Sequence, residues 1–205
     1  MRREKLVAVW MGERKKPMSC KVRETRPAGP QTLRRAGARA ESHAPRRNGM
    51  DITWLTDEIA VGGGIWNAMN MAKVAAAGIS HIIDMQIEFD DTPLAAEYSI
   101  AVLWNATDDD FEHKPAELFE RGVEFARKAL ESGGKVLIHC AAGVHRAPMM
   151  AAALLGTMGW ELADALRLIE TRRQVVDFPD VYVRSVEQFL EGREKSFTTE
   201  GSAGH

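Results

Sequence analysis

Cysteine is scarce in this sequence of 205 residues, which contains only Cys20 and Cys140. Two cysteines are too few for a disulfide scaffold or a four-cysteine zinc module. No apolar run approaches the roughly 20 residues that a membrane-spanning helix needs, and the apolar run at 6–10 is too brief for a signal peptide. No spacing of His and Asp residues indicates a metal site. These absences predict a cytoplasmic protein without a membrane span, metal or cofactor.

Charge is distributed unevenly along the chain. Residues 1–49 hold 14 Lys/Arg and 4 Asp/Glu, whereas residues 50–205 hold 13 and 25. The basic first stretch has few large apolar residues, so little burial would offset the entropy of ordering it. We therefore predict a disordered extension over 1–49. Contact of this arm with nucleic acid or anionic lipid is the less favoured alternative, and a natural start at Met50 is another.

The remaining sequence alternates short apolar strands with amphipathic helices over residues 50–192. This order predicts an α/β domain with a central, mostly parallel sheet flanked by helices. Strands are predicted within 52–61, which a turn interrupts, and over 79–85, 100–104 and 135–139. Helices are predicted over 66–77, 115–130, 146–158, 161–172 and 181–190. The polar end of the chain, 193–205, is predicted to be a flexible tail.

One segment carries most of the chemical information, and it reads His139-Cys140-Ala141-Ala142-Gly143-Val144-His145-Arg146. A buried strand ends at Cys140, and a loop of small residues leads into a helix that begins at Arg146. Successive N–H groups in such a loop converge on one point, and the helix N-terminus adds positive potential. We therefore predict that residues 141–146 (Ala141, Ala142, Gly143, Val144, His145 and Arg146) bind phosphate.

Cys140 stands at the centre of this predicted cradle. A thiolate held beneath a phosphoryl group is a nucleophile for covalent phosphoryl transfer, and the planar fork of Arg146 can bind two phosphate oxygens. The alternative, a small buried residue at a strand end, explains the cysteine alone but not its spacing from Arg146.

The segment resembles the signature loop of the protein tyrosine phosphatase superfamily, in its dual-specificity class. That signature is His-Cys, two residues, Gly, two residues, Arg. The resemblance covers about 51–190 and includes Ile59–Met85, which is similar to the first strand–helix–strand unit of those enzymes. It implies a protein-tyrosine-phosphatase-like fold and hydrolysis of phosphotyrosine and/or phosphoserine/threonine. It also implies that His139 orients the loop.

The resemblance further implies an aspartic acid that protonates the departing oxygen and lies about thirty residues before the cysteine. Asp108 and Asp109, 32 and 31 residues before Cys140, both fit. We favour Asp108, which comes first after the preceding strand, and keep Asp109 as the alternate; Asp110 is a weaker third candidate. The implied reaction passes through a cysteinyl-phosphate, with Arg146 stabilising the transition state.

Four positions bear on where this sequence departs from the family. Ala147 stands where Ser or Thr is usual, which predicts slow breakdown of the phosphoenzyme. His145 is either a titratable cation beside the phosphate or an outward rim residue. Arg172 and Arg173, at the end of a predicted helix, could reach a second phosphate near the mouth of the site, but a solvated helix end is the favoured interpretation.

The implied partner is a phosphorylated protein or a small phosphorylated substrate. Because the loop is also similar to that of glucan phosphatases, a phosphoglucan substrate is an alternative. A phosphoinositide or another small phosphate is a further alternative. A non-catalytic phosphate-binding module is another.

Overall fold

The computed structural model describes residues 50–200, so the predicted extension over 1–49 lies outside the described residues. Five strands form one sheet in the order β1-β2-β5-β3-β4. They are β1 (Ile52–Trp54), β2 (Ile59–Gly62), β3 (His81–Asp84), β4 (Ala101–Trp104) and β5 (Val136–His139). Only the β1–β2 pairing is antiparallel, and the other three pairings are parallel. The predicted mostly parallel sheet is confirmed.

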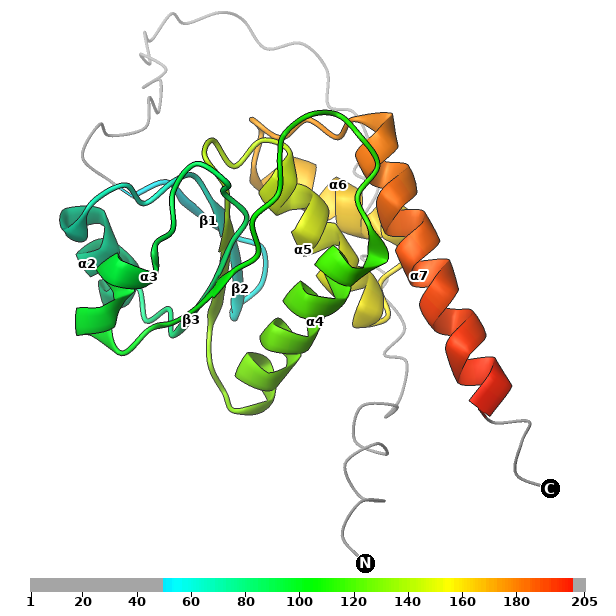
Figure 1. Ribbon diagram of the computed structural model, residues 1–205, viewed down its shortest axis with the longest axis horizontal. Coiled ribbons are helices and arrows are strands. Elements are labelled where there is room, and N and C mark those ends of the chain that lie inside the picture. The colour runs from blue at the N-terminus through cyan, green and yellow to red at the C-terminus, as the bar shows by residue number, and fades with distance from the viewer. Residues whose placement is uncertain (1–49, 201–205) are drawn as a thin grey trace, which may run out of the picture. The chain divides into compact units, whose positions relative to one another are not determined.

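Helices cover both faces of the sheet, as Figure 1 shows. On one face lie α2 (Ala68–Ala76), α3 (Thr92–Ala95) and the short 3₁₀ helix η1 (Ala96–Tyr98). On the other lie α4 (Ala116–Glu131), α5 (Arg146–Thr157), α6 (Leu162–Arg172) and α7 (Asp180–Glu200). None of the helices over residues 50–200 is long and apolar enough to cross a membrane.

Strand β5 is central because its side chains are apolar on both faces. Val136 and Ile138 pack with the helices of the α4–α7 face, whereas Leu137 packs with the α2 face. This alternation follows from the two-residue period of a strand, and burial on both faces is typical of a parallel sheet with helices on each side. The strand therefore carries its last residue, His139, and the following Cys140 into the interior at the carboxyl edge of the sheet.

Helix α5 runs through the middle of the helical layer. Its residues from Arg146 to Leu155 are all buried, and it contacts α4, α6 and α7. Close packing depends on small residues here: a Cβ on Gly122 of α4 would lie 2.5 Å from the sulfur of Met150. The loop after β5 therefore leads into a helix that is buried over most of its length.

Two segments differ from the sequence predictions. Helix α7 continues to Glu200, so residues 193–200 are helical in the segment for which the sequence predicted a flexible tail. The pattern of 181–190 identified only the apolar first half of the helix, because the second half is polar. The short helices α3 and η1 were not predicted at all, since four and three residues show no helical periodicity.

Candidate active site

The loop after β5 places Cys140 inside the domain, with 1% of its surface exposed. Gly143 adopts a φ of +66°, a left-handed conformation that favours glycine. A Cβ at this position would also lie 2.5 Å from the carbonyl oxygen of Gly62 on the neighbouring strand β2. Both constraints explain the glycine in the signature: it lets the chain turn sharply while packed against the sheet.

Four consecutive carbonyl oxygens of the loop accept hydrogen bonds from groups outside it. The oxygen of Ala141 accepts from the N–H of Gly64 (3.0 Å), and that of Val144 from the N–H of Asp177 (3.2 Å). The two between them, on residues 142 and 143, both accept from the guanidinium of Arg173. With every carbonyl oxygen held from outside, the opposite ends of these peptide units are directed into the loop.

The N–H groups of the loop are the complementary half of this arrangement. That of Gly143 donates to Sγ of Cys140 at 3.3 Å. Those of Ala141, Ala142, Val144 and His145 donate to no other group among residues 50–200. Inward N–H groups next to a helix N-terminus form an anion site, and Sγ of Cys140 lies against one of these donors. The geometry agrees with the predicted phosphate cradle.

Arg146 is held by its two terminal nitrogens. These donate to the carboxylate of Glu88 at 2.9 and 2.8 Å, and one also donates to the carbonyl oxygen of Thr107 at 3.0 Å. The hydrogen bond from Arg146 holds the pKa of Glu88 below its usual value. Burial lowers the pKa of Arg146, but the Glu88 and Cys140 charges outweigh it and raise the pKa overall. Its Nε is buried and makes no hydrogen bond among the described residues.

The candidate acids occupy different surroundings. Asp109 lies 3.1 Å from Nδ1 of His145 and 3.7 Å from Nε of Arg146, and its carboxylate accepts from the hydroxyl of Tyr182 at 3.1 Å. Burial raises the pKa of Tyr182 to about 12, so this hydroxyl remains a donor. Asp108 is exposed and its side chain makes no hydrogen bond or ion pair within residues 50–200. The side chain of Asp109 is therefore held by neighbouring groups, whereas that of Asp108 is exposed to solvent.

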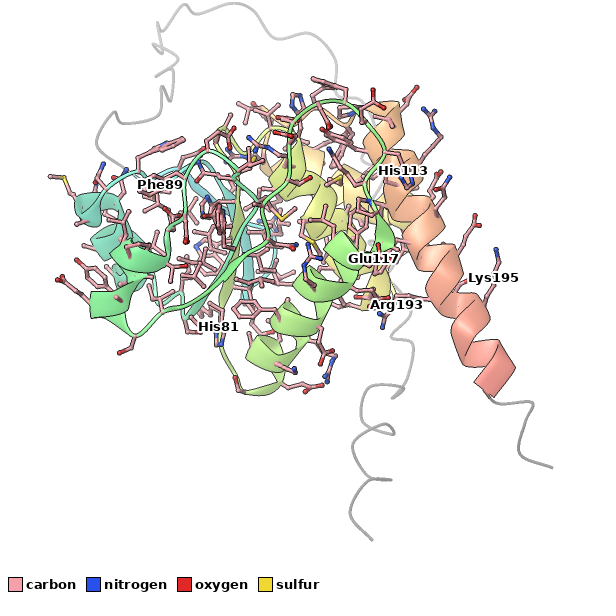
Figure 2. All side chains as sticks on the ribbon, viewed as in Figure 1. His81, Phe89, His113, Glu117, Arg193 and Lys195 are labelled. Atoms are coloured by element: carbon pink, nitrogen blue, oxygen red, sulfur yellow. The ribbon has the colours of Figure 1, made fainter. Side chains whose placement is uncertain are left out.

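The acid-bearing segment is anchored on helix α7. Its Phe111 N–H donates to the Tyr182 hydroxyl at 3.2 Å, and the two rings stack with centroids 6.1 Å apart. His113, labelled beside α7 in Figure 2, lies 2.8 Å from Oε1 of Gln188. Asp110 pairs with the buried Lys114, whose ammonium group lowers the pKa of this carboxyl. Asp110 is therefore engaged away from the phosphate loop.

His139 lies in a fully buried cluster behind Cys140. Its Nε2 is 2.8 Å from Asp91 and 3.7 Å from Asp84. Asp84 also accepts backbone N–H groups from Gln86 (2.9 Å) and Asp91 (3.2 Å). Burial is the main cause that raises the pKa of Asp84, to about 6. The carboxylates of Asp84 and Asp91 and the imidazole of His139 each offer a possible metal-ligand atom, and these atoms lie within 4.8 Å of one another, a spacing that could hold a metal ion. The close His139–Asp91 contact also fits an ion pair that orients the histidine.

The structure brings the predicted residues Cys140, Arg146, Asp109 and His145 together. His145 is half-buried and lies between Asp109 and Asp177, which places it on the rim and pairs it with the acidic segment. The expectation of a solvated Arg173 is wrong, because this side chain is 3% exposed and bonded to the loop.

The sequence analysis did not identify three residues that contact the site, which are Asp84, Glu88 and Asp91. Asp84 gave a signal, being a carboxylate in an apolar strand pattern. Glu88 and Asp91 gave none, because their partners are far away along the chain.

Comparison with known proteins identifies the class to which this fold and loop belong. Among solved structures, that of PTPMT1 in complex with PI(5)P has a TM-score of 0.65 and 19% identity, covering 71% of this chain and 97% of the other. The structure of DUSP15 has a TM-score of 0.62 and 20% identity, covering 76% and 99%. The fold is that of protein tyrosine phosphatases and dual-specificity phosphatases.

The sequence comparisons are more specific. Residues 64–191 match the family "Dual specificity phosphatase, catalytic domain", so the chain belongs to the dual-specificity phosphatase family. It is 36% identical over 74 residues to dual specificity protein phosphatase 5 of Rattus norvegicus, covering 36% of this chain. It is 28% identical over 116 residues to protein phosphatase Slingshot of Drosophila melanogaster, covering 56%. The matches span only 19% and 11% of these relatives' own lengths.

Proposed function

We propose that this chain hydrolyses phosphomonoesters through a cysteinyl-phosphate on Cys140. One observation carries the proposal: four loop carbonyl oxygens accept hydrogen bonds from outside the loop, while the N–H of Gly143 donates to the sulfur of the buried Cys140. A ring of N–H donors matches the three non-bridging oxygens of a phosphoryl group, and it needs no rearrangement when charge develops on them. Arg146 follows the loop directly, and its buried Nε makes no hydrogen bond among the described residues.

The reaction has two displacements at phosphorus. The Cys140 thiolate attacks, the bond to the leaving oxygen breaks, and Asp108 gives that oxygen its proton. Water then attacks phosphorus, the S–P bond breaks, and the Asp108 carboxylate accepts the proton from the water. The products are an alcohol or phenol, inorganic phosphate and the restored thiolate.

Asp108 is the proposed acid because its carboxyl group makes no bond that would hold it in place, whereas Asp109 already contacts His145, Arg146 and Tyr182. Two matched variants separate the pair. Asp108→Asn should slow hydrolysis of an alkyl phosphate about a hundredfold and that of a p-nitrophenyl phosphate much less, because a good leaving group needs no proton. If Asp109→Asn shows this dependence on the leaving group instead, Asp109 is the acid.

The rim of the site favours a phosphoprotein over a more highly charged substrate. Glu88, Asp109 and Asp177 are exposed acidic residues that contact Arg146 or His145, and the exposed Asp108 precedes Asp109 in the chain. Each further phosphate on an inositol or glucan would add negative charge near these carboxylates. We therefore propose phosphotyrosine and/or phosphoserine/threonine in proteins as the substrate, with phosphoinositide and phosphoglucan as the alternatives.

The decisive assay compares phosphate release from p-nitrophenyl phosphate by the parent and by Cys140→Ser. Loss of activity in the variant supports the cysteine mechanism, whereas equal rates would indicate a non-catalytic phosphate-binding module. The same serine variant can then retain substrates from a panel of phosphopeptides, phosphoinositide vesicles and phosphoglucan. Preferential retention of a vesicle or a glucan would contradict the proposed substrate class.

A further inference from the structure

Arg173 is a buried arginine that immediately follows helix α6, on the outer side of the phosphate loop. Its Nε donates to the carbonyl oxygen of Gly143 at 2.7 Å, and its Nη2 donates to that of Ala142 at 3.1 Å. The contact is so close that a Cβ on Gly143 would overlap Nη2. One side chain therefore holds two adjacent peptide units of the loop.

The guanidinium is held in turn by the first strand region. Nη1 and Nη2 donate to the two carboxylate oxygens of Asp51 at 2.8 and 2.5 Å, and Nη1 also donates to Oγ1 of Thr53 at 3.1 Å. An arginine has five N–H donors in a rigid plane, and here all five have acceptors. Asp51 and Arg173 are 122 residues apart in the chain, so this pair links the segment before strand β1 to the segment after helix α6, next to the loop.

Peptide geometry links these outer contacts to the chemistry inside the loop. In a planar trans peptide, the carbonyl oxygen and the following N–H point in opposite directions. Holding the Ala142 oxygen outward therefore directs the Gly143 N–H inward, where it donates to Sγ of Cys140. Holding the Gly143 oxygen outward does the same for the N–H of Val144.

We propose that Asp51 and Arg173 form a positioning pair, which sets the orientation of two phosphate-binding peptide units and of the N–H that contacts the nucleophile. The inference rests on the proposed function of the loop. Lysine in place of Arg173 would not substitute for it, because a single ammonium cannot span two carbonyl oxygens and a carboxylate in one plane.

The test compares Arg173→Met and Asp51→Asn with Arg172→Met, all in a Cys20→Ser background so that Cys140 is the only thiol. Arg172 is the exposed neighbour at the same helix end, so its variant removes the same charge without touching the loop. The measurements are turnover of p-nitrophenyl phosphate, the pH midpoint of iodoacetamide alkylation, and the affinity for vanadate.

We expect Arg173→Met to lower turnover about tenfold to a hundredfold and to raise the alkylation midpoint by about one pH unit. Vanadate affinity should fall by a comparable factor. Asp51→Asn should shift all three in the same direction by less, because the asparagine still accepts one bond, and Asp51→Glu should restore part of the loss. Arg172→Met should behave as the parent.

A lower melting temperature with an unchanged alkylation midpoint and unchanged turnover per folded molecule would overturn the proposal, leaving Arg173 a purely structural residue. An equal shift in Arg172→Met would also overturn it, by showing a general charge effect. Failure of the proposed function would give a different result, because Cys140→Ser would then release phosphate as fast as the parent. The alkylation midpoint remains informative in that case because it does not depend on turnover.

Discussion

Replacing Asp84 with asparagine tests the charge balance of the buried cluster next to Cys140. Asp84, Asp91 and His139 are all 0% exposed. Asp91 lies closer to the imidazole of His139 than Asp84 does, at 2.8 against 3.7 Å, so Asp84 has the more distant contact with this ring. An ionised Asp84 would then be an excess buried charge, which is unfavourable in a low-dielectric interior. An asparagine at this position would keep the shape of the side chain without the charge.

The magnitude follows from the pKa of Asp84, which burial raises from 3.8 to about 6. Between these values the folded chain retains a proton that the unfolded chain has lost, so the free energy of unfolding decreases as pH rises through this window. A rise of about two pKa units corresponds to about 3 kcal/mol. The asparagine would lose about 1 kcal/mol because its amide cannot accept the hydrogen bond from the Asp91 N–H. At pH 8 we expect Asp84→Asn to be more stable than the parent by about 2 kcal/mol.

Urea unfolding of parent and variant across pH 4 to 8 measures this difference. The advantage of the variant should shrink as pH falls through 6 and should reverse near pH 4, where the parent carboxyl is protonated in the folded state and partly protonated in the unfolded state, so most of the burial penalty has disappeared. A variant that is less stable than the parent at pH 8, or a difference that does not change with pH, would refute the reasoning. An unchanged m-value would show that both chains unfold from the same compact state.

Three further variants probe packing and catalysis. Gly122→Ala should cost about 1–3 kcal/mol in urea unfolding, because its Cβ would overlap Met150, while turnover per folded molecule stays the same. Ala147→Ser should speed breakdown of the phosphoenzyme several-fold, so the pre-steady-state burst expected of the parent should shrink; a parent without a burst contradicts this. His145→Asn should change the pH profile of turnover between about pH 5 and 8, because it removes a titratable contact of Asp109. Superimposable profiles would exclude that role.

Much of the fold could be predicted because its strands and helices have strong local patterns. The apolar run of β5 and the helical spacing in α4 each place buried residues without knowledge of the rest of the chain. The second half of α7 has no apolar stripe, so its sequence looks like that of a solvated tail. Its helical structure continues from the packed first half. Helices α3 and η1 are too short for periodicity and depend on the fold around them.

The candidate site, like the fold, could be predicted from the sequence only in part. Cys140, Gly143 and Arg146 lie within seven residues, so their spacing alone predicts a loop that binds an anion. Glu88 and Arg173 reach the same loop from 58 and 30 residues away in the chain. Arginines and glutamates are mostly exposed in proteins, so a solvated side chain is the reasonable expectation for each until the fold is known.

Residues outside the signature determine how the peptide units of the loop are oriented. A loop of N–H groups pointing at one centre concentrates positive partial charges, and the bare loop could relax by turning peptide units over. In this chain each of the four carbonyl oxygens from Ala141 to Val144 is held from outside, by donors before the loop and by others well after it. The spacing from Cys140 to Arg146 therefore predicts where the chemistry occurs, and the surrounding contacts determine whether the N–H groups face the phosphate. A chain with the signature but without acceptable substitutes for these outer donors should bind phosphate weakly, because part of the binding energy would be used to order the loop.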